Sequence, residues 1–436
     1  MIELKKIHPT FIVGFSFLLI IGFYFFIEQI LRPVGGDAPS YMEIARAYNS
    51  KSIVAAQTDS HRTFAYPWIL SLLIKLSGIA NFPDILLIFV FQTTAYLFAT
   101  LLIVSSVSNH SSKLASILFV ALCFNIYVIP YHGITLTDSL YTSISIMIFG
   151  ILIRLECLSA PGNNDLVKWI FYLIFLLSWG IVIRPAAIWL SVPVFYCIVR
   201  LFTKGYVKIT DLILVLITGA VPLYIQICLN VLNYKVISFL PAANLGGMQI
   251  QWGIENVKYG TWMGNGGIGN YYSSKSIIGT VTDPSIRWYF GNPSKAIRLL
   301  SLKMVGAFDF DYLMPYPYRK LALGWIPSFL SFSILWFGSL GVVFHLFTGK
   351  LRALGSRFMP LIIFLSWSSV ALISALELRF TLPLLSYFIV VGSVFIFYLL
   401  NGSKKWICIS FMGCIISMPI FYITAKFIRS LSSVIS

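Results

Sequence analysis

Two acidic residues stand at the start of predicted helices, where a carboxylate could act on a substrate hydroxyl. Asp37 follows two glycines, and Ser40 and Glu43 then have the spacing of a capping box. Asp138 opens a second predicted helix at the start of a long apolar run. Because a helix N-terminus favours the ionised carboxylate, we expect both acids to be charged at neutral pH. Each could act as a general base, or could simply cap its helix.

Three arginines could bind a phosphate group. Arg62 lies in the polar stretch after the first apolar run, and Arg184 interrupts the apolar run 169–202. Arg379 closely follows Glu377. A charge near a membrane boundary is costly without a partner or a function, and the planar guanidinium matches the oxygens of a phosphate. The alternatives are an arginine that only sets topology and, for Arg379, an ion pair with Glu377.

A segment rich in aromatic residues and proline, 303–318, is a further candidate. Its acids Asp309 and Asp311 could bind a divalent cation, but two acids do not specify a metal. We therefore predict no cofactor and leave a divalent cation open. The aromatic and proline content, which includes Tyr316, better fits a loop over a cavity in which aromatic faces pack on sugar rings.

The composition is that of an integral membrane protein with many spans. Of the 436 residues, 58% are hydrophobic and only 11% are charged, and the mean hydropathy is +0.87. Soluble domains of this size do not have such a composition. We therefore predict an all-α polytopic membrane protein. Its apolar runs predict about eleven transmembrane helices, near residues 11–31, 85–107, 114–130, 136–155, the two halves of 169–202, 210–232, 326–347, 358–376, 380–400 and 406–425.

Two polar stretches interrupt the predicted spans. The first, 32–83, carries an amphipathic helix and a half-apolar piece, 66–79, that is expected to lie on the membrane. The second, 233–325, is a larger outer loop region. The predicted parts are an N-terminal transmembrane module at 1–232 that includes the first loop, the loop region at 233–325, and C-terminal transmembrane helices at 326–436.

The basic residues of the short loops predict the orientation of the chain. Lysines and arginines gather in every second short loop, and placing those loops inside puts the N-terminus in the cytoplasm. Both candidate acids and all three arginines then lie on the outer side. The net charge of +16 is explained by this orientation and by contact with anionic lipid, not by binding to nucleic acid. We expect a multi-pass protein of the cell (inner) membrane whose site faces the periplasm or the outside.

The order of five short motifs resembles the GT-C superfamily of integral membrane glycosyltransferases, which use polyprenyl-phosphate sugars. This superfamily includes protein O-mannosyltransferases and lipid A aminoarabinose transferases. The resemblance runs from the first to about the sixth predicted span and returns at the ninth and tenth. The motifs are Asp37-Ala38-Pro39-Ser40-Tyr41, Arg62-Thr63-Phe64-Ala65-Tyr66-Pro67, Leu136-Thr137-Asp138, Ile183-Arg184-Pro185 and Glu377-Leu378-Arg379.

The resemblance implies an inverting transfer of a sugar from an undecaprenyl-phosphate donor on the outer face. Asp37 would be the general base, with Asp138 as its nearest rival. The arginines would stabilise the departing lipid phosphate, and the acceptor would be a cell-envelope glycan such as O-antigen, with lipid A or protein left open. The implied residues for the lipid phosphate and sugar are Arg62, Arg184, Arg379, Glu377, Tyr41, Lys303 and Tyr316.

Two other functions explain part of the pattern. A transporter or flippase of a lipid-linked saccharide would account for the spans, but it predicts acids buried at mid-span and internal repeats. The second to eleventh predicted spans are almost free of central charge, and no sequence repeat is visible. A polymerase or ligase that uses a lipid-diphosphate glycan would depend on a histidine in the large outer loop, and 233–325 has none. This loop region is also a central insertion, unlike the C-terminal domain of oligosaccharyltransferase-like members, which leaves the acceptor open.

Overall fold

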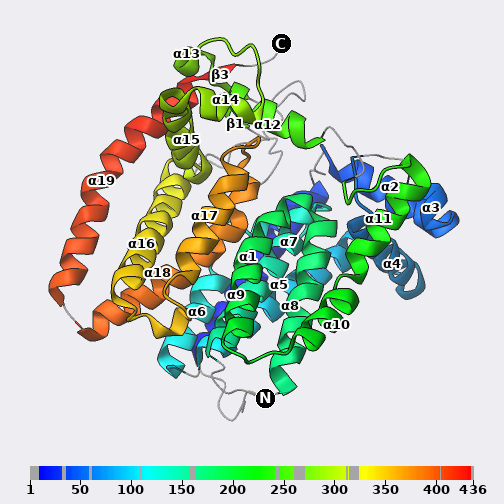
Figure 1. Ribbon diagram of the computed structural model, residues 1–436, viewed down its shortest axis with the longest axis horizontal. Helices are drawn as coiled ribbons and strands as arrows, with labels where there is room; N and C mark the ends of the chain where they lie inside the picture. The colour runs from blue at the N-terminus through cyan, green and yellow to red at the C-terminus, as the bar shows by residue number, and fades with distance from the viewer. Residues whose placement is uncertain are drawn as a thin grey trace. The chain divides into compact units, whose positions relative to one another are not determined.

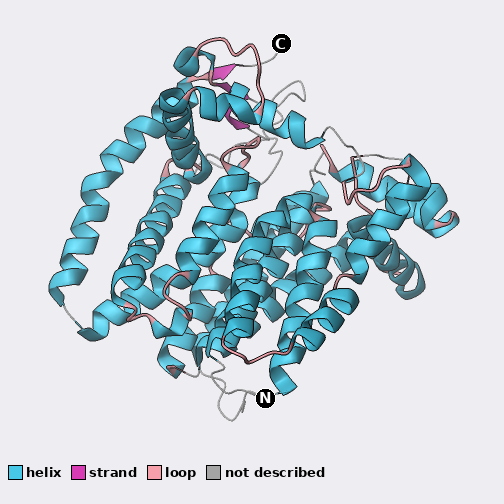
Figure 2. Cartoon of the chain, in the orientation of Figure 1, coloured by secondary structure: helices cyan, strands magenta, loops and turns pink. Residues whose placement is uncertain are grey.

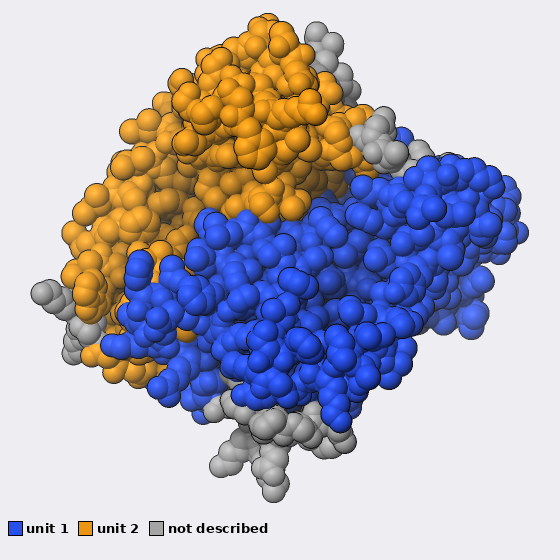
Figure 3. Space-filling view, viewed as in Figure 1, with its two compact units in different colours: residues 1–243, 346–366 blue, residues 244–345, 367–436 orange. Residues whose placement is uncertain are grey.

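Helices make up nearly all of the chain that the structure describes (Figure 2). The structure is a computed structural model, and it describes residues 9–31, 36–57, 61–108, 110–157, 164–240, 245–259, 271–310, 313, 324–402 and 404–433. The chain divides into two compact units (Figure 3). Unit 1 comprises residues 1–243 and 346–366, and unit 2 comprises residues 244–345 and 367–436.

Eight helices within the described ranges are long and apolar enough to cross a membrane. A ninth span results if α10 (Ile209–Gly219) and α11 (Val221–Tyr234), which meet at 50°, form one broken span. The chain is therefore a multi-pass helical membrane protein. The eight are α1 (Pro9–Leu31), α5 (Asp84–Ser108), α7 (Thr137–Cys157), α8 (Asn164–Ile183), α9 (Ser191–Thr203) with the preceding turn η2 (Pro185–Leu190), α16 (Ile326–Thr348), α18 (Leu382–Gly402) with the preceding turn η4 (Leu378–Thr381), and α19 (Lys404–Ser430).

The expected count of about eleven spans is too high, because two of the expected spans form short helices. The helix α6 (Ser112–Cys123) has 12 residues and α17 (Met359–Ala371) has 13. A helix needs about 20 residues to cross the hydrocarbon core. In both places the apolar sequence continues past the helix as a largely buried segment of turns, at 124–136 and at 372–377. The expected surface piece, α4 (Ala65–Ala80), is likewise a short apolar helix.

The helix α7 forms the centre of unit 1 and is buried along almost its whole length. It packs against α5, α8 and α9 (Figure 1). Gly150 permits a close approach to α5, because a Cβ at this position would lie 3.1 Å from the Ile103 Cα. The Thr142 hydroxyl donates to the Asp138 carbonyl oxygen one turn earlier, at 2.7 Å. Polar side chains of α7 are thus accommodated without contact with water.

One end of the unit 1 bundle carries the first polar stretch. Here α1 and α8 end, α5 and α7 begin, and α2 (Ala38–Ser50), α3 (Ile53–Ala56) and α4 pack beside them. Gly133, just before α7, lies against the backbone of Phe26 in α1. Trp68 of α4 stacks on Trp179 near the end of α8, with ring centroids 5.9 Å apart. We call this end of the bundle the site end of unit 1.

Unit 2 contains a small folded region before its transmembrane helices, so part of the expected loop region has its own core. Three short strands form an antiparallel sheet in the order β1-β2-β3. The buried core of this region includes Ile254, Val257, Trp288 and Leu299. Its elements are α12 (Leu245–Glu255), β1 (Asn256–Tyr259), β2 (Tyr271–Ser273), α13 (Lys275–Ile278), α14 (Ile286–Gly291), α15 (Pro293–Phe308) and β3 (Ser432–Ser433).

Candidate functional site

Asp37 lies at the site end of unit 1 and pairs with Arg62. Its Oδ1 is 2.7 Å from the Arg62 Nη2. The preceding Gly36 has a φ of 65°, a left-handed conformation that favours glycine, and this allows the turn between α1 and α2. Asp37 occupies the N-cap position of α2, but its side chain makes no capping hydrogen bond. Asp37 thus stands at the helix start as the capping alternative expected, but its carboxylate pairs with a guanidinium and not with a backbone N–H of α2.

Local contacts fix the position of Arg62. The Gln57 amide donates to the Arg62 carbonyl oxygen at 2.6 Å. The guanidinium of Arg62 lies over the Tyr41 ring, 4.8 Å from its centroid. The structure thus brings together three of the predicted site residues, Asp37, Arg62 and Tyr41, from α2 and the stretch before α4.

Asp138 and Arg184 form a second pair at the same end of unit 1. The Arg184 Nη1 donates to the Asp138 Oδ1 at 2.5 Å and to the Thr137 hydroxyl at 3.0 Å. Arg184 stands between α8 and η2 and precedes Pro185, which favours the extended backbone observed there (φ −145°, ψ 107°). This conformation ends α8 and directs the guanidinium to the first turn of α7. The pairing was not predictable from spacing, because 46 positions separate the two residues.

Tyr66 lies beside the first pair. Its ring packs edge-on against Tyr41, with centroids 5.1 Å apart. Burial raises the pKa of Tyr66 well above its ordinary value, and Tyr41 and Asp138 raise it further. Both acid–arginine pairs, together with Tyr41 and Tyr66, make up the polar patch at the site end of unit 1.

Burial distinguishes the two carboxylates. The Asp37 side chain is 30% exposed and that of Arg62 is 21% exposed. The Asp138 side chain is 0% exposed, and its partner Arg184 retains 11%. A general base must come within hydrogen-bond reach of the hydroxyl it deprotonates. The Asp37 carboxylate is accessible from solvent, whereas the Asp138 carboxylate is buried and binds Arg184.

In unit 2, Glu377 and Arg379 form the ion pair that was left open as an alternative. The Arg379 Nε and Nη2 donate to the two Glu377 carboxylate oxygens at 2.5 and 3.2 Å. Both residues stand at the start of the α18 span, in and just before η4. The Glu377 backbone also pairs with Tyr259 of β1. A bidentate contact of this kind fixes the plane of the guanidinium.

Lys303 is not placed to contact a phosphate directly. It is fully buried on α15, and its Nζ donates to the carbonyl oxygens of Leu372 and Ser374 at 2.7 and 2.8 Å. Burial lowers the pKa of Lys303 well below its ordinary value. The lysine predicted from sequence as a phosphate contact therefore binds backbone carbonyls.

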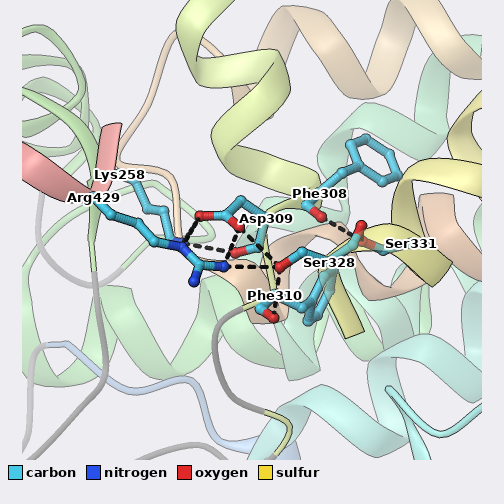
Figure 4. A network of polar contacts seen from close by, with 7 residues as sticks. All are labelled: Lys258, Phe308, Asp309, Phe310, Ser328, Ser331 and Arg429. Carbon is cyan, nitrogen blue, oxygen red and sulfur yellow. Dashed lines mark hydrogen bonds and ion pairs between the residues drawn. The ribbon is translucent and has the colours of Figure 1, made fainter. Parts of the chain in front are cut away.

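Asp309, a candidate metal ligand in the sequence, is the centre of a buried ionic network (Figure 4). The Arg429 Nε donates to its Oδ2 at 2.9 Å, and the Ser328 hydroxyl donates to its Oδ1 at 2.8 Å. The Lys258 Nζ lies 3.4 Å from Oδ2 and donates to the Asp309 carbonyl oxygen at 2.7 Å. Burial would raise the pKa of Asp309, but Lys258 and Arg429 outweigh it and hold the pKa below its ordinary value.

Sequence reasoning did not identify Lys258 and Arg429 as partners of this acid. They lie 51 and 120 positions from Asp309, and no local pattern relates residues at such separations. Among the described residues, no group of three or more His, Cys, Asp or Glu is placed to hold a metal ion. Two of the predicted positions, Asp311 and Tyr316, lie outside the described residues.

Comparison with known proteins adds no family assignment. No protein-family model, curated protein or solved structure matches the chain at a significant level. The helix lengths and hydropathy described above establish a multi-pass helical membrane protein.

Proposed function

We propose that the protein is an inverting glycosyltransferase that moves a sugar from a polyprenyl phosphate to a hydroxyl of a cell-envelope acceptor. The observation that carries this proposal is the patch at the site end of unit 1. There, a partly exposed carboxylate, Asp37, is oriented by Arg62, and a second arginine, Arg184, at the same end of the unit is held in place by a buried carboxylate. One acid that can accept a proton and arginines that can bind a phosphate are the groups such a transfer requires.

In the proposed reaction, Asp37 takes the proton of the acceptor hydroxyl as its oxygen attacks the anomeric carbon of the sugar. The bond from that carbon to the phosphate oxygen breaks, and the polyprenyl phosphate leaves with an additional negative charge. A single displacement inverts the anomeric centre. Arg184 is suited to stabilise the leaving phosphate, because its position is fixed by Asp138 and Thr137 before the substrate arrives.

The other predicted residues take supporting roles in this proposal. The Arg62 guanidinium stacks on the Tyr41 ring beside Asp37. We propose that these two side chains orient the sugar. The Glu377–Arg379 pair on unit 2 is a third acid–arginine pair. We propose Arg379 as a further phosphate-binding arginine.

The proposed location is the cell membrane, with the site end of unit 1 facing outward and the N-terminus in the cytoplasm. The opposite end of unit 1 bears the exposed lysines 113, 168, 204 and 208 near the ends of α6, α8, α9 and α10. Positive charge of this kind marks cytoplasmic loops. A membrane donor whose phosphate lies at the outer leaflet would reach the site end without entering the bundle.

The decisive experiment measures sugar transfer from a radiolabelled undecaprenyl-phosphate sugar by the full chain in nanodiscs, with cell-envelope extract as acceptor. Asp37→Asn is expected to lower the rate by at least about a hundredfold, because it removes the base while preserving the shape of the side chain. Glu43→Gln is the matched control, since it makes the same acid-to-amide change at an exposed position of α2. Transfer by Asp37→Asn at the wild-type rate would show that the base assignment is wrong.

A further inference from the structure

The segment 372–377, which leads into the Glu377–Arg379 pair, is held by hydrogen bonds from several elements of unit 2. This segment is irregular, apolar and largely buried, so its backbone groups need partners. The partners come from α14, α12 and β1. The bonds run from the Tyr289 hydroxyl to the Ile373 carbonyl oxygen (2.9 Å), from the Ala375 N–H to the Gln249 carbonyl oxygen (2.8 Å) and from the Tyr259 N–H to the Leu376 carbonyl oxygen (2.7 Å).

Lys303 adds two hydrogen bonds to this arrangement from α15. Its Nζ bridges the carbonyl oxygens of Leu372 and Ser374, two positions apart on the segment. A lysine side chain suits this task, because its terminal nitrogen stands on a flexible stem and can donate to both carbonyl oxygens. A buried lysine is otherwise costly and rare, and no apolar side chain could supply these bonds. The position of Lys303 thus indicates a specific role in holding the segment.

The backbone of α12 fits closely against the same segment. At Gly253, a Cβ would lie 2.3 Å from the Ile373 carbonyl oxygen and 2.6 Å from the Ser374 carbonyl oxygen. No side chain other than hydrogen fits there without displacing backbone. The segment therefore has one defined position, set by Lys303 on one side and by α12 on another.

We propose that Lys303 is a positioning residue that fixes Arg379, through the 372–377 segment, for binding the phosphate of the lipid donor. This inference rests on the proposed function, in which Arg379 binds that phosphate. The path is short and continuous. Lys303 holds Leu372 and Ser374, and Glu377 stands three positions after Ser374. The Glu377 carboxylate then binds the Arg379 guanidinium through two nitrogen atoms. Lys303 itself touches no substrate, since it is buried.

The first test compares Lys303→Met with Lys295→Met in the full chain in nanodiscs. Both lysines lie on α15, but Lys295 is exposed. The Ala375 and Tyr259 amides form hydrogen bonds between the segment and its neighbours, so their rates of hydrogen exchange report how often the segment opens. Lys303→Met is expected to speed this exchange about tenfold, because two bonds to the segment are lost, and Lys295→Met is expected to leave it unchanged. Unchanged exchange in Lys303→Met would overturn the inference.

The second test separates positioning of Arg379 from general loosening. Lys303→Met is expected to raise KM for the undecaprenyl-phosphate sugar about tenfold with kcat nearly unchanged, as loss of uniform phosphate binding does. In a double-variant cycle, Lys303→Met should add little to the defect of Arg379→Gln, because it acts through that arginine. Independent, multiplying effects of the two substitutions would contradict the proposal.

Further results distinguish a failure of this inference from a failure of the variant to fold or of the proposed function. If Lys303→Met does not fold, Tyr289→Phe removes one donor to the same segment and is expected to move exchange and KM in the same direction by a smaller factor. If the wild-type chain transfers no sugar from a polyprenyl phosphate, the proposed function fails and the phosphate role of Lys303 fails with it. If the wild type is active and Lys303→Met leaves KM unchanged, the positioning inference fails and the proposed function stands.

Discussion

At the scale of single residues, Asp37 and Asp138 differ in burial, and this makes their two arginine pairs energetically different. Removing one partner of a buried pair leaves an uncompensated charge and costs about 3–5 kcal/mol, whereas a partly exposed pair contributes about 0–1 kcal/mol. Asp138→Asn is therefore expected to lower the free energy of unfolding by several kcal/mol, and Asp37→Asn by about 1 kcal/mol or less. Unfolding in mixed detergent micelles measures the free energy of unfolding of both variants. A larger loss in Asp37→Asn than in Asp138→Asn would contradict the assigned roles.

Lys303 should make stability depend on pH in a defined direction. Its pKa is lowered by burial well below the ordinary value of 10.5, so the folded protein holds fewer protons than the unfolded chain between the lowered pKa and 10.5. In that window this group makes unfolding less favourable as the pH rises. The stability of the wild type relative to Lys303→Met is therefore expected to rise as the pH increases from the lowered pKa toward 10.5. Melting temperatures of the wild type and of Lys303→Met across this pH range test the prediction. A difference in melting temperature that does not change with pH would contradict a lowered pKa of Lys303.

The sequence identified the residues that form the acid–arginine pairs, but of the three pairs it suggested only that of Glu377 with Arg379. Asp37, Asp138 and the three arginines stand out because charges at the ends of apolar runs are unusual. Their partners are set by the way helices pack, and 25 positions separate Asp37 from Arg62. Asp37 takes the expected N-cap position of α2, but its carboxylate binds the Arg62 guanidinium and makes no capping hydrogen bond. The prediction that Lys303 contacts the lipid phosphate was wrong, because the sequence does not show that backbone carbonyl oxygens will surround this lysine.

At the scale of elements, hydropathy predicted the long apolar helices, but it did not predict where each one ends or that α12 to α15 would form in the expected loop region. The runs 114–130 and 358–376 are apolar throughout, yet the helices within them stop at Cys123 and Ala371. The chain can leave the helix where other parts of the protein satisfy its backbone groups, as they do for 372–377. Hydropathy counts apolar side chains and cannot detect such partners. This is why the expected number of spans exceeded the eight or nine supported by helix length.

The fit between α12 and the 372–377 segment gives a prediction for one glycine. In Gly253→Ala the new Cβ would lie 2.3 Å from the Ile373 carbonyl oxygen and 2.5 Å from the Ser374 carbonyl carbon, so backbone must move. We expect a loss of about 1–3 kcal/mol or more in the free energy of unfolding. Gly246→Ala is the matched control on the same helix, because a Cβ there meets nothing within 4 Å. Equal stability of the two variants would show that the segment is not tightly held.

At the scale of the whole molecule, the arrangement of charge predicts which side of the membrane each part faces. The exposed lysines 113, 168, 204 and 208 lie in short loops at the end of unit 1 opposite Asp37, and long polar regions are exempt from the rule that places positive loops inside. The side of the membrane on which both long polar regions lie is therefore predicted from the charges of the short loops alone. The proposed chemistry requires this orientation, because the sugar donor would present its phosphate at the outer leaflet.

Single cysteines can test this orientation in each unit separately. Lys51 after α2 and Lys275 in α13 are exposed positions predicted to face outward, and Lys204 after α9 is an exposed position predicted to face the cytoplasm. With the exposed Cys228 and Cys408 replaced by serine, a membrane-impermeant maleimide should label Lys51→Cys and Lys275→Cys in intact spheroplasts. It should label Lys204→Cys only after the membrane is opened. Labelling of Lys51→Cys only from the cytoplasmic side would place Asp37 where no outer-leaflet donor could reach it, and the proposed transfer would fail with it.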